Sequence, residues 1–149
     1  MKKILLILLI TTILSVTGCE KNTNSEKQID SSSADTILGH ESESGLKYTL
    51  YIGLNDKDTY EQIISTEDAI DKANHICAEY AGGYTQFTAR GGWTNDDGSL
   101  GHENTLVYII YDISEDNLKN MLDEILKEFN QSSILVEENE ISHIYYSGE

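Results

Sequence analysis

Thr105-Leu106-Val107-Tyr108-Ile109-Ile110-Tyr111 is the most apolar strand that the sequence predicts. β-Branched and aromatic residues, which favour strands, make up most of it. A strand this apolar is expected at the centre of a sheet. The segments on either side of it therefore decide which sheet is built.

Further strands are expected on both sides of this run. Strand-favouring residues and alternation of side-chain types predict them over 48–52, 84–90 and 133–136. Gly91-Gly92-Trp93 is expected to close the second of these, and Asn95 to Ser99 form a loop with an Asp-Gly turn signal. Residues 141–146 either continue the last strand after a kink or add a short extra one.

Two helices separate the strands. Ser65 and Ser114 each precede acidic residues, a pattern typical of a capped helix start. Gly82-Gly83 is expected to stop the first helix. Apolar positions recur at helical spacing in both helices: Ile70, Ala73, Cys77 and Tyr80 in the first, and Leu118, Leu122, Ile125 and Phe129 in the second.

The resulting order, β-α-β-β-α-β, predicts an α+β, ferredoxin-like fold. In this fold two helices pack on one face of a four-stranded antiparallel sheet. The opposite face is then either a partner surface or covered by a second copy of the chain.

The N-terminus has the pattern of an export signal. Two lysines and an apolar run over 4–16 precede Thr17-Gly18-Cys19. The cysteine after the small residues resembles the lipobox of bacterial lipoproteins, in which the thiol receives a diacylglycerol. The apolar run is shorter than the roughly 20 residues that a spanning helix needs. We therefore expect residues 1–18 to be a lipoprotein signal peptide and Cys19 to hold the protein through membrane lipid, on the extracytoplasmic face of the cell membrane.

The segment after the cysteine is polar. Residues 19–45 are mostly Ser, Asn, Asp, Glu and Lys, with a brief interruption at Ile37-Leu38. Such a segment cannot bury enough apolar surface to offset its ordering entropy. The sequence therefore predicts a lipidated cysteine followed by a flexible tether over 19–45, and an α+β domain over 46–149.

The charge of the chain restricts its partners. The formal net charge is −16, and removing residues 1–18 removes two lysines and no acid, which makes it −18. Nucleic acid is not expected as a partner, because its phosphates need Lys and Arg. The simplest interpretation of this negative charge is that it keeps the protein soluble. Divalent cations or a basic partner are the alternatives.

A polar cluster lies around the loop after the second strand: Arg90, Trp93, Asn95, Asp96, Asp97, His102 and Glu103. It has three interpretations. In the first, Asp97-Gly98 turns the chain and the acids are merely solvated. In the second, a ligand pocket uses Trp93 as a flat face, Arg90 to pair an anion and Glu103 to orient it. In the third, a metal ion is held by Asp96, Asp97, His102 and Glu103. An EF-hand alignment fails, because Trp93 falls on the first ligand position.

No catalytic constellation is visible. Cys77 is the only cysteine left after lipidation, so it forms no intrachain disulfide, and its place on the apolar helix face predicts a core residue. Gly-rich phosphate loops, His-Glu-x-x-His and Gly-x-Ser-x-Gly are absent. We assign no catalytic residue, metal ligand or cofactor, and expect a non-catalytic module that binds a small molecule or a protein. The alternatives are a metal-dependent or other small hydrolase acting at the Trp93–Glu103 loop, and a self-associating domain such as a homodimer.

Four motifs carry a family resemblance: Gly91-Gly92-Trp93, Asp97-Gly98, Glu103-Asn104 and Phe129-Asn130-Gln131-Ser132-Ser133-Ile134. With them, residues 51–136 resemble an uncharacterised bacterial family of small exported domains, a domain of unknown function. The chain departs from the pattern at Asn104 and Ile134, and it lacks the family's cluster of proline and arginine before the second strand. The resemblance implies no activity, but it suggests that Trp93, Glu103 and Gln131 form one site or one packing motif. The candidate ligand-binding residues are Arg90, Trp93, Asp97, His102, Glu103 and Gln131.

Overall fold

A computed structural model describes residues 35–148. The expected signal peptide over 1–18, the lipidated Cys19 and the tether up to residue 34 lie outside the described residues. Within the described range, no helix combines the length and the apolar character needed to cross a membrane.

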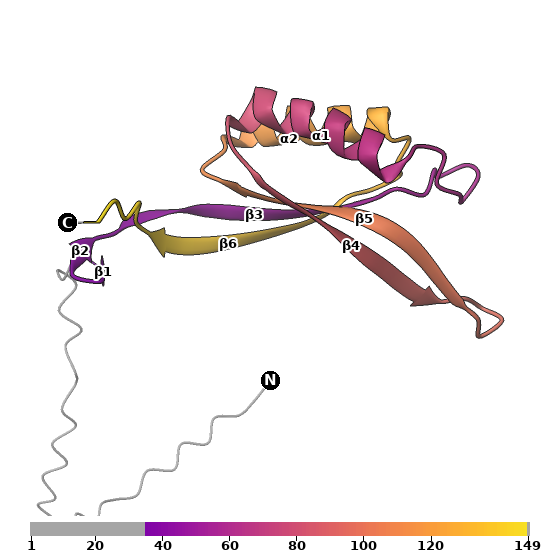
Figure 1. Ribbon diagram of the computed structural model, residues 1–149, viewed down its shortest axis with the longest axis horizontal. Helices are drawn as coiled ribbons and strands as arrows, with labels where there is room; N and C mark the ends of the chain where they lie inside the picture. Colours follow the sequence, from indigo (N-terminus) through magenta and orange to yellow (C-terminus); the bar gives the residue numbers. More distant parts are fainter. Residues whose placement is uncertain (1–34, 149) are drawn as a thin grey trace, which may run out of the picture. The chain divides into compact units, whose positions relative to one another are not determined.

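The domain is a four-stranded antiparallel sheet with two helices on one face (Figure 1). The strands of this sheet are β3 (Glu43–Gly53), β4 (Thr85–Thr94), β5 (Leu100–Tyr111) and β6 (Leu135–His143), and the helices are α1 (Thr66–Ala81) and α2 (Glu115–Glu128). A small hairpin of β1 (Thr36–Ile37) and β2 (His40–Glu41) precedes them. The sheet order is β4-β5-β3-β6, which is the ferredoxin-like arrangement that the sequence predicts.

Both helix starts and the end of α1 are the predicted ones. The side chain of Ser65 accepts a hydrogen bond from the backbone N–H of Asp68, and Ser114 accepts one from Asn117. Gly82 ends α1 in the left-handed conformation, at φ +70°, which glycine adopts without steric cost. These three helix ends are therefore determined by residues next to them in the sequence.

The core lies between the sheet and the helices. The fully buried side chains of β3 and β5 meet those of the helices, and they include Leu50, Ile52, Leu106, Tyr108, Ile110, Cys77, Met121 and Ile125. The buried stripes are displaced from the predicted ones: Ala69 and Ile76 are buried, whereas Ile70 and Tyr80 only pack against the core. The tyrosine hydroxyl instead donates to Glu124 on α2 at 2.8 Å.

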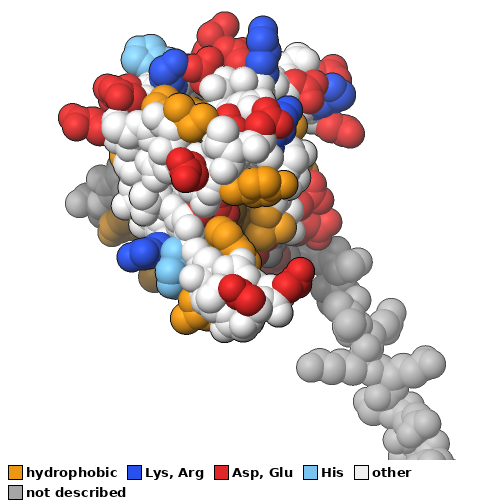
Figure 2. Space-filling view, turned by 90° about the vertical axis from the view of Figure 1, so that its right-hand side faces the viewer, with side chains coloured by type: hydrophobic (Ala, Val, Ile, Leu, Met, Phe, Trp, Pro, Cys, Tyr) orange, Lys and Arg blue, Asp and Glu red, His pale blue; other side chains and the backbone are white. Residues whose placement is uncertain are grey.

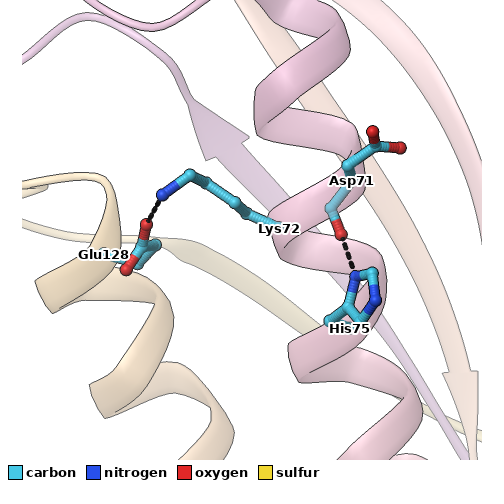
Figure 3. Close-up of polar contacts among 4 residues, drawn as sticks. All are labelled: Asp71, Lys72, His75 and Glu128. Atoms are coloured by element: carbon cyan, nitrogen blue, oxygen red, sulfur yellow. Dashed lines mark hydrogen bonds and ion pairs between the residues drawn. The ribbon is translucent and has the colours of Figure 1, made fainter.

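Two polar contacts support the helical layer (Figure 3). Lys72 of α1 pairs with Glu128 of α2 and joins the two helices. His75 contacts the carbonyl oxygen of Asp71 through Nδ1 at 2.7 Å, so Nδ1 carries the hydrogen in this bond. Both contacts lie on the helical side of the domain, away from the uncovered face of the sheet.

Cys77 is a core residue, as predicted. Its side chain is 0% exposed, and burial raises the pKa of the thiol to about 12. A nucleophilic cysteine needs an accessible thiolate. Cys77 is therefore a packing residue.

The strands are longer than the sequence predicts. β4 continues through Gly91-Gly92-Trp93 to Thr94 instead of closing there, and β5 begins at Leu100 instead of 105. β6 runs without a break to His143. Backbone hydrogen bonds to a neighbouring strand build these extensions, and such pairing leaves no local signal in the sequence.

The start of the domain also differs from the predicted boundary at residue 46. β3 begins at Glu43, because the strand residues Glu43, Ser44 and Gly45 pair with β6. The small β1–β2 hairpin lies within the range predicted as tether, and it includes the apolar pair Ile37-Leu38 at its turn.

Candidate functional site

The register of the β4–β5 hairpin decides which candidate residues share a face. Directly paired residues of antiparallel strands point to the same side of the sheet. Trp93 pairs with Gly101, and Glu103 pairs with Gly91. These positions alternate with the helix-facing residues of β5, so Trp93 and Glu103 lie on the uncovered face, which we call the open face.

Trp93, Glu103 and Gln131 line a single cavity of about 740 Å³ at the open face. We call this cavity the open-face pocket. The residues come from β4, from β5 and from the segment after α2, and the family resemblance had placed them together. Polar and aromatic residues of β3, of the loop after it and of the segment before β6 also line the pocket, together with one glycine: Tyr51, Gly53, Asp56, Lys57, Asp58, Tyr60 and Ser133.

Trp93 lies directly over the backbone of β5. A Cβ atom built on Gly101 would lie 2.3 Å from Cε2 of the indole, so the ring occupies the space that any side chain at position 101 would need. The indole Nε1 donates a hydrogen bond to Oδ1 of Asn95 at 2.8 Å. The ring is thereby fixed while remaining 45% exposed, and it offers a flat apolar surface to the pocket.

Glu103 extends over β3. A Cβ atom on Gly53 would lie 2.5 Å from its Oε2, so the carboxylate rests on a glycine of the neighbouring strand. The ion pairs found within residues 35–148 leave this carboxylate without a counter-charge. They join Lys72 to Glu128, Lys119 to Asp123, and His143 to Glu43 and Asp112.

Asp56 fixes one wall of the pocket. Its carboxylate accepts hydrogen bonds from Nδ2 of Asn130 at 2.8 Å and from the backbone N–H groups of Asp58 and Thr59. These bonds, that from Asn130 first, lower the pKa of Asp56, because they stabilise the charged form. Gln131 adds a hydrogen bond from Nε2 to the carbonyl oxygen of Asn55 at 2.7 Å. Hydrogen bonds between the loop after β3 and the residues that follow α2 therefore hold this wall in place.

Three sequence candidates lie elsewhere. Arg90 pairs with Asn104 and His102 with Gly92, so both project from the face opposite to Trp93. The carboxylate of Asp97 accepts hydrogen bonds from the hydroxyl and from the backbone N–H of Ser99, and these bonds lower its pKa. Arg90 therefore does not complete the anion-pairing part of the pocket hypothesis, and Asp97 stabilises the turn.

The metal hypothesis gains no support from the geometry. Across residues 35–148, no three His, Cys, Asp or Glu side chains lie close enough together to hold an ion. Asp96 and Asp97 occupy the turn, whereas His102 and Glu103 point to opposite faces of β5.

Several pocket residues were missed at the sequence level. Tyr51, Gly53, Lys57 and Tyr60 are distant in sequence from the Trp93–Glu103 hairpin and reach the pocket through the pairing of β3 with β5. The available signals were the glycine at the end of the first strand and the polar turn after it. Neither signal shows which strand lies next to β3.

The open face is also apolar. Four large side chains on it are exposed: Phe87, Trp93, Tyr111 and Leu135. Figure 2 looks at the end of the domain that carries the β4–β5 turn and shows hydrophobic side chains gathered in its middle, among acidic ones. An apolar surface with acidic surroundings suits a ligand or partner that is partly apolar.

Comparisons with known proteins place these features in context. The family model described as "Protein of unknown function (DUF3574)" matches residues 47–143. No curated protein matches the chain. Among solved structures, a phage SAM lyase in its apo state has 22% identity and a TM-score of 0.50, covering 76% of this chain and 100% of its own. CutA from Synechococcus elongatus has 10% identity and a TM-score of 0.48, covering 68% of this chain and 82% of its own. At these identities the likeness is one of fold.

Proposed function

The chain belongs to the DUF3574 family, whose model matches more than half of it, and from this premise we propose that it is a lipid-anchored, extracytoplasmic protein that binds a small molecule in the open-face pocket. The family is one of unknown function, so the proposal rests on the site. One observation carries it: Trp93, Glu103 and Gln131, from three separate parts of the chain, line one cavity. A cavity of about 740 Å³ lies within the usual size range of small-molecule sites.

The lining favours binding over catalysis. It contains carboxylates, an amide, hydroxyls and aromatic rings, which can orient a ligand, and it contains neither histidine nor cysteine. Nucleophilic catalysis requires an activated nucleophile next to a base. The single described thiol, that of Cys77, is buried in the core with a pKa raised to about 12.

A thermal-shift screen tests the pocket. The lipidated protein in detergent micelles is heated with a panel of small polar, cationic and anionic compounds. A ligand at 100 times its Kd stabilises the native state by about 2.7 kcal/mol, which raises Tm by several degrees. We expect Trp93→Leu and Glu103→Gln to abolish the shift.

His102→Gln is the matched control, because His102 is adjacent to Glu103 but lies on the other face. It is expected to leave the shift intact. A shift that survives both pocket variants would place the ligand elsewhere, and the absence of any shift across the panel would count against small-molecule binding.

The anchor is tested by fractionation. The lipobox at Thr17-Gly18-Cys19 supports it, and the acidity of the chain opposes direct adsorption to anionic headgroups. Replacing Cys19 with serine removes the thiol that would be acylated, so we expect the protein to move from the membrane fraction to the soluble fraction. Cys77→Ala, which removes the other thiol, should remain with the membranes. Membrane association of the Cys19→Ser protein would contradict the anchor.

A further inference from the structure

The open-face pocket places a partly buried carboxylate beside an aromatic ring. Glu103 and Trp93 both lie on the open face, and the carboxylate has no counter-charge among the residues of the structure. An unneutralised carboxylate in a partly desolvated site favours a positive ligand. The face of a tryptophan ring attracts the same kind of charge, because its π system carries negative potential.

The surrounding charges agree with this preference. Asp56, Asp58 and Glu103 line the pocket against a single ammonium group, that of Lys57. Asp56 and Asp58 both accept hydrogen bonds from Asn130, so these two carboxylates are held in place by the wall. The carboxylate of Glu103, by contrast, accepts no hydrogen bond from the residues of 35–148. The acidity of the whole chain adds a long-range attraction for cations.

The geometry disfavours the other two classes of charged ligand. An anion would face three carboxylates, and Arg90 lies on the opposite side of β4. A metal ion needs several ligating groups at once, and within residues 35–148 no three suitable side chains come together. A cavity of about 740 Å³ is also far larger than a bare ion needs.

We infer that the open-face pocket binds a small organic cation, such as a quaternary ammonium group, between the indole of Trp93 and the carboxylate of Glu103. The inference rests on the proposed function and names its ligand class. The apolar part of the cation lies on the ring and on the apolar lining. The positive charge lies against the carboxylate.

The test compares choline with dimethylbutanol, its uncharged carbon isostere. The chain contains one tryptophan, so fluorescence excited at the red edge of the absorption, where tyrosine does not absorb, reports on Trp93 alone. The lipidated protein in detergent micelles is titrated with each compound at constant ionic strength. The charge of choline makes a cation–π contact that dimethylbutanol cannot make, so we expect choline to bind about tenfold more tightly than dimethylbutanol.

Two variants locate the charge preference. Glu103→Gln keeps the shape of the side chain and is expected to weaken choline binding about tenfold, with dimethylbutanol unchanged. Gly53→Ala displaces the same carboxylate without altering it, because the new Cβ would overlap Oε2, and it should have the same effect. Asp96→Asn removes one negative charge from the β4–β5 turn, outside the pocket lining, and should leave choline binding unchanged.

The outcomes separate this inference from the proposed function. Equal binding of choline and dimethylbutanol, or tighter binding of acetate, inorganic phosphate or calcium, would overturn the cation class and leave the pocket as a ligand site. An equal loss of choline binding in Asp96→Asn would assign the preference to net charge and overturn the role of Glu103. If no compound of any charge perturbs Trp93 or raises Tm, the proposed function itself fails.

Discussion

Replacing Leu106 with alanine will lower the free energy of unfolding by about 2–5 kcal/mol. Leu106 is 0% exposed, and it pairs with Ile52 on the helix-covered side of the central strands. Truncation removes buried methyl groups and leaves a cavity between the sheet and the helices, which packed surroundings fill only in part. Since small domains are stable by only about 5–15 kcal/mol, this loss is a large part of the total.

Urea denaturation followed by circular dichroism measures this effect. Leu100→Ala is the matched control, because Leu100 belongs to the same strand but is 71% exposed. It is expected to change the free energy of unfolding by no more than about 0.5 kcal/mol. If the two variants unfold at the same urea concentration, β5 does not form the core in the way described here.

Gly101→Ala will displace the indole of Trp93 from the sheet. The new methyl group would lie 2.3 Å from a ring carbon, and the ring is too rigid to absorb such an overlap without moving. The hydrogen bond from Nε1 to Asn95 is then lost, at a cost of about 1 kcal/mol. Trp93, now 45% exposed, is then expected to become more accessible to solvent.

Acrylamide quenching of the single tryptophan measures the displacement, which should appear as a steeper quenching slope and a red-shifted emission. Gly83→Ala is the control, because nothing lies within 4 Å of a Cβ at that position and its φ is not in the left-handed region. Unchanged quenching in Gly101→Ala would mean that the indole does not rest on the glycine.

Much of the fold could be predicted because its signals are local. Ser65 and Ser114 cap the helices through bonds to residues three positions later, and Gly82 ends α1 through its own backbone conformation. The apolar run over 105–111 identified the strand that became central. These features, taken in order along the chain, are enough to specify the β-α-β-β-α-β arrangement.

The strand ends and half of the pocket could not be predicted in this way. Residues 100–104 are Leu-Gly-His-Glu-Asn, which carry little strand preference and are extended because they pair with β4. Tyr51 and Lys57 reach the pocket only because β3 lies beside β5. Local chemistry identified Trp93 and Glu103, whereas long-range pairing determined that Arg90 lies on the other face.

The length of β3 separates the pocket from the residue at which the chain enters the sheet. The strand begins at Glu43, where the chain enters the sheet, and ends at Gly53, where the pocket begins. Its eleven residues span about 33 Å at the usual rise of an extended strand. The pocket therefore lies at the opposite end of β3 from Glu43. A ligand that binds as proposed would therefore enter at the end of the sheet opposite to the one where the chain from Cys19 joins it.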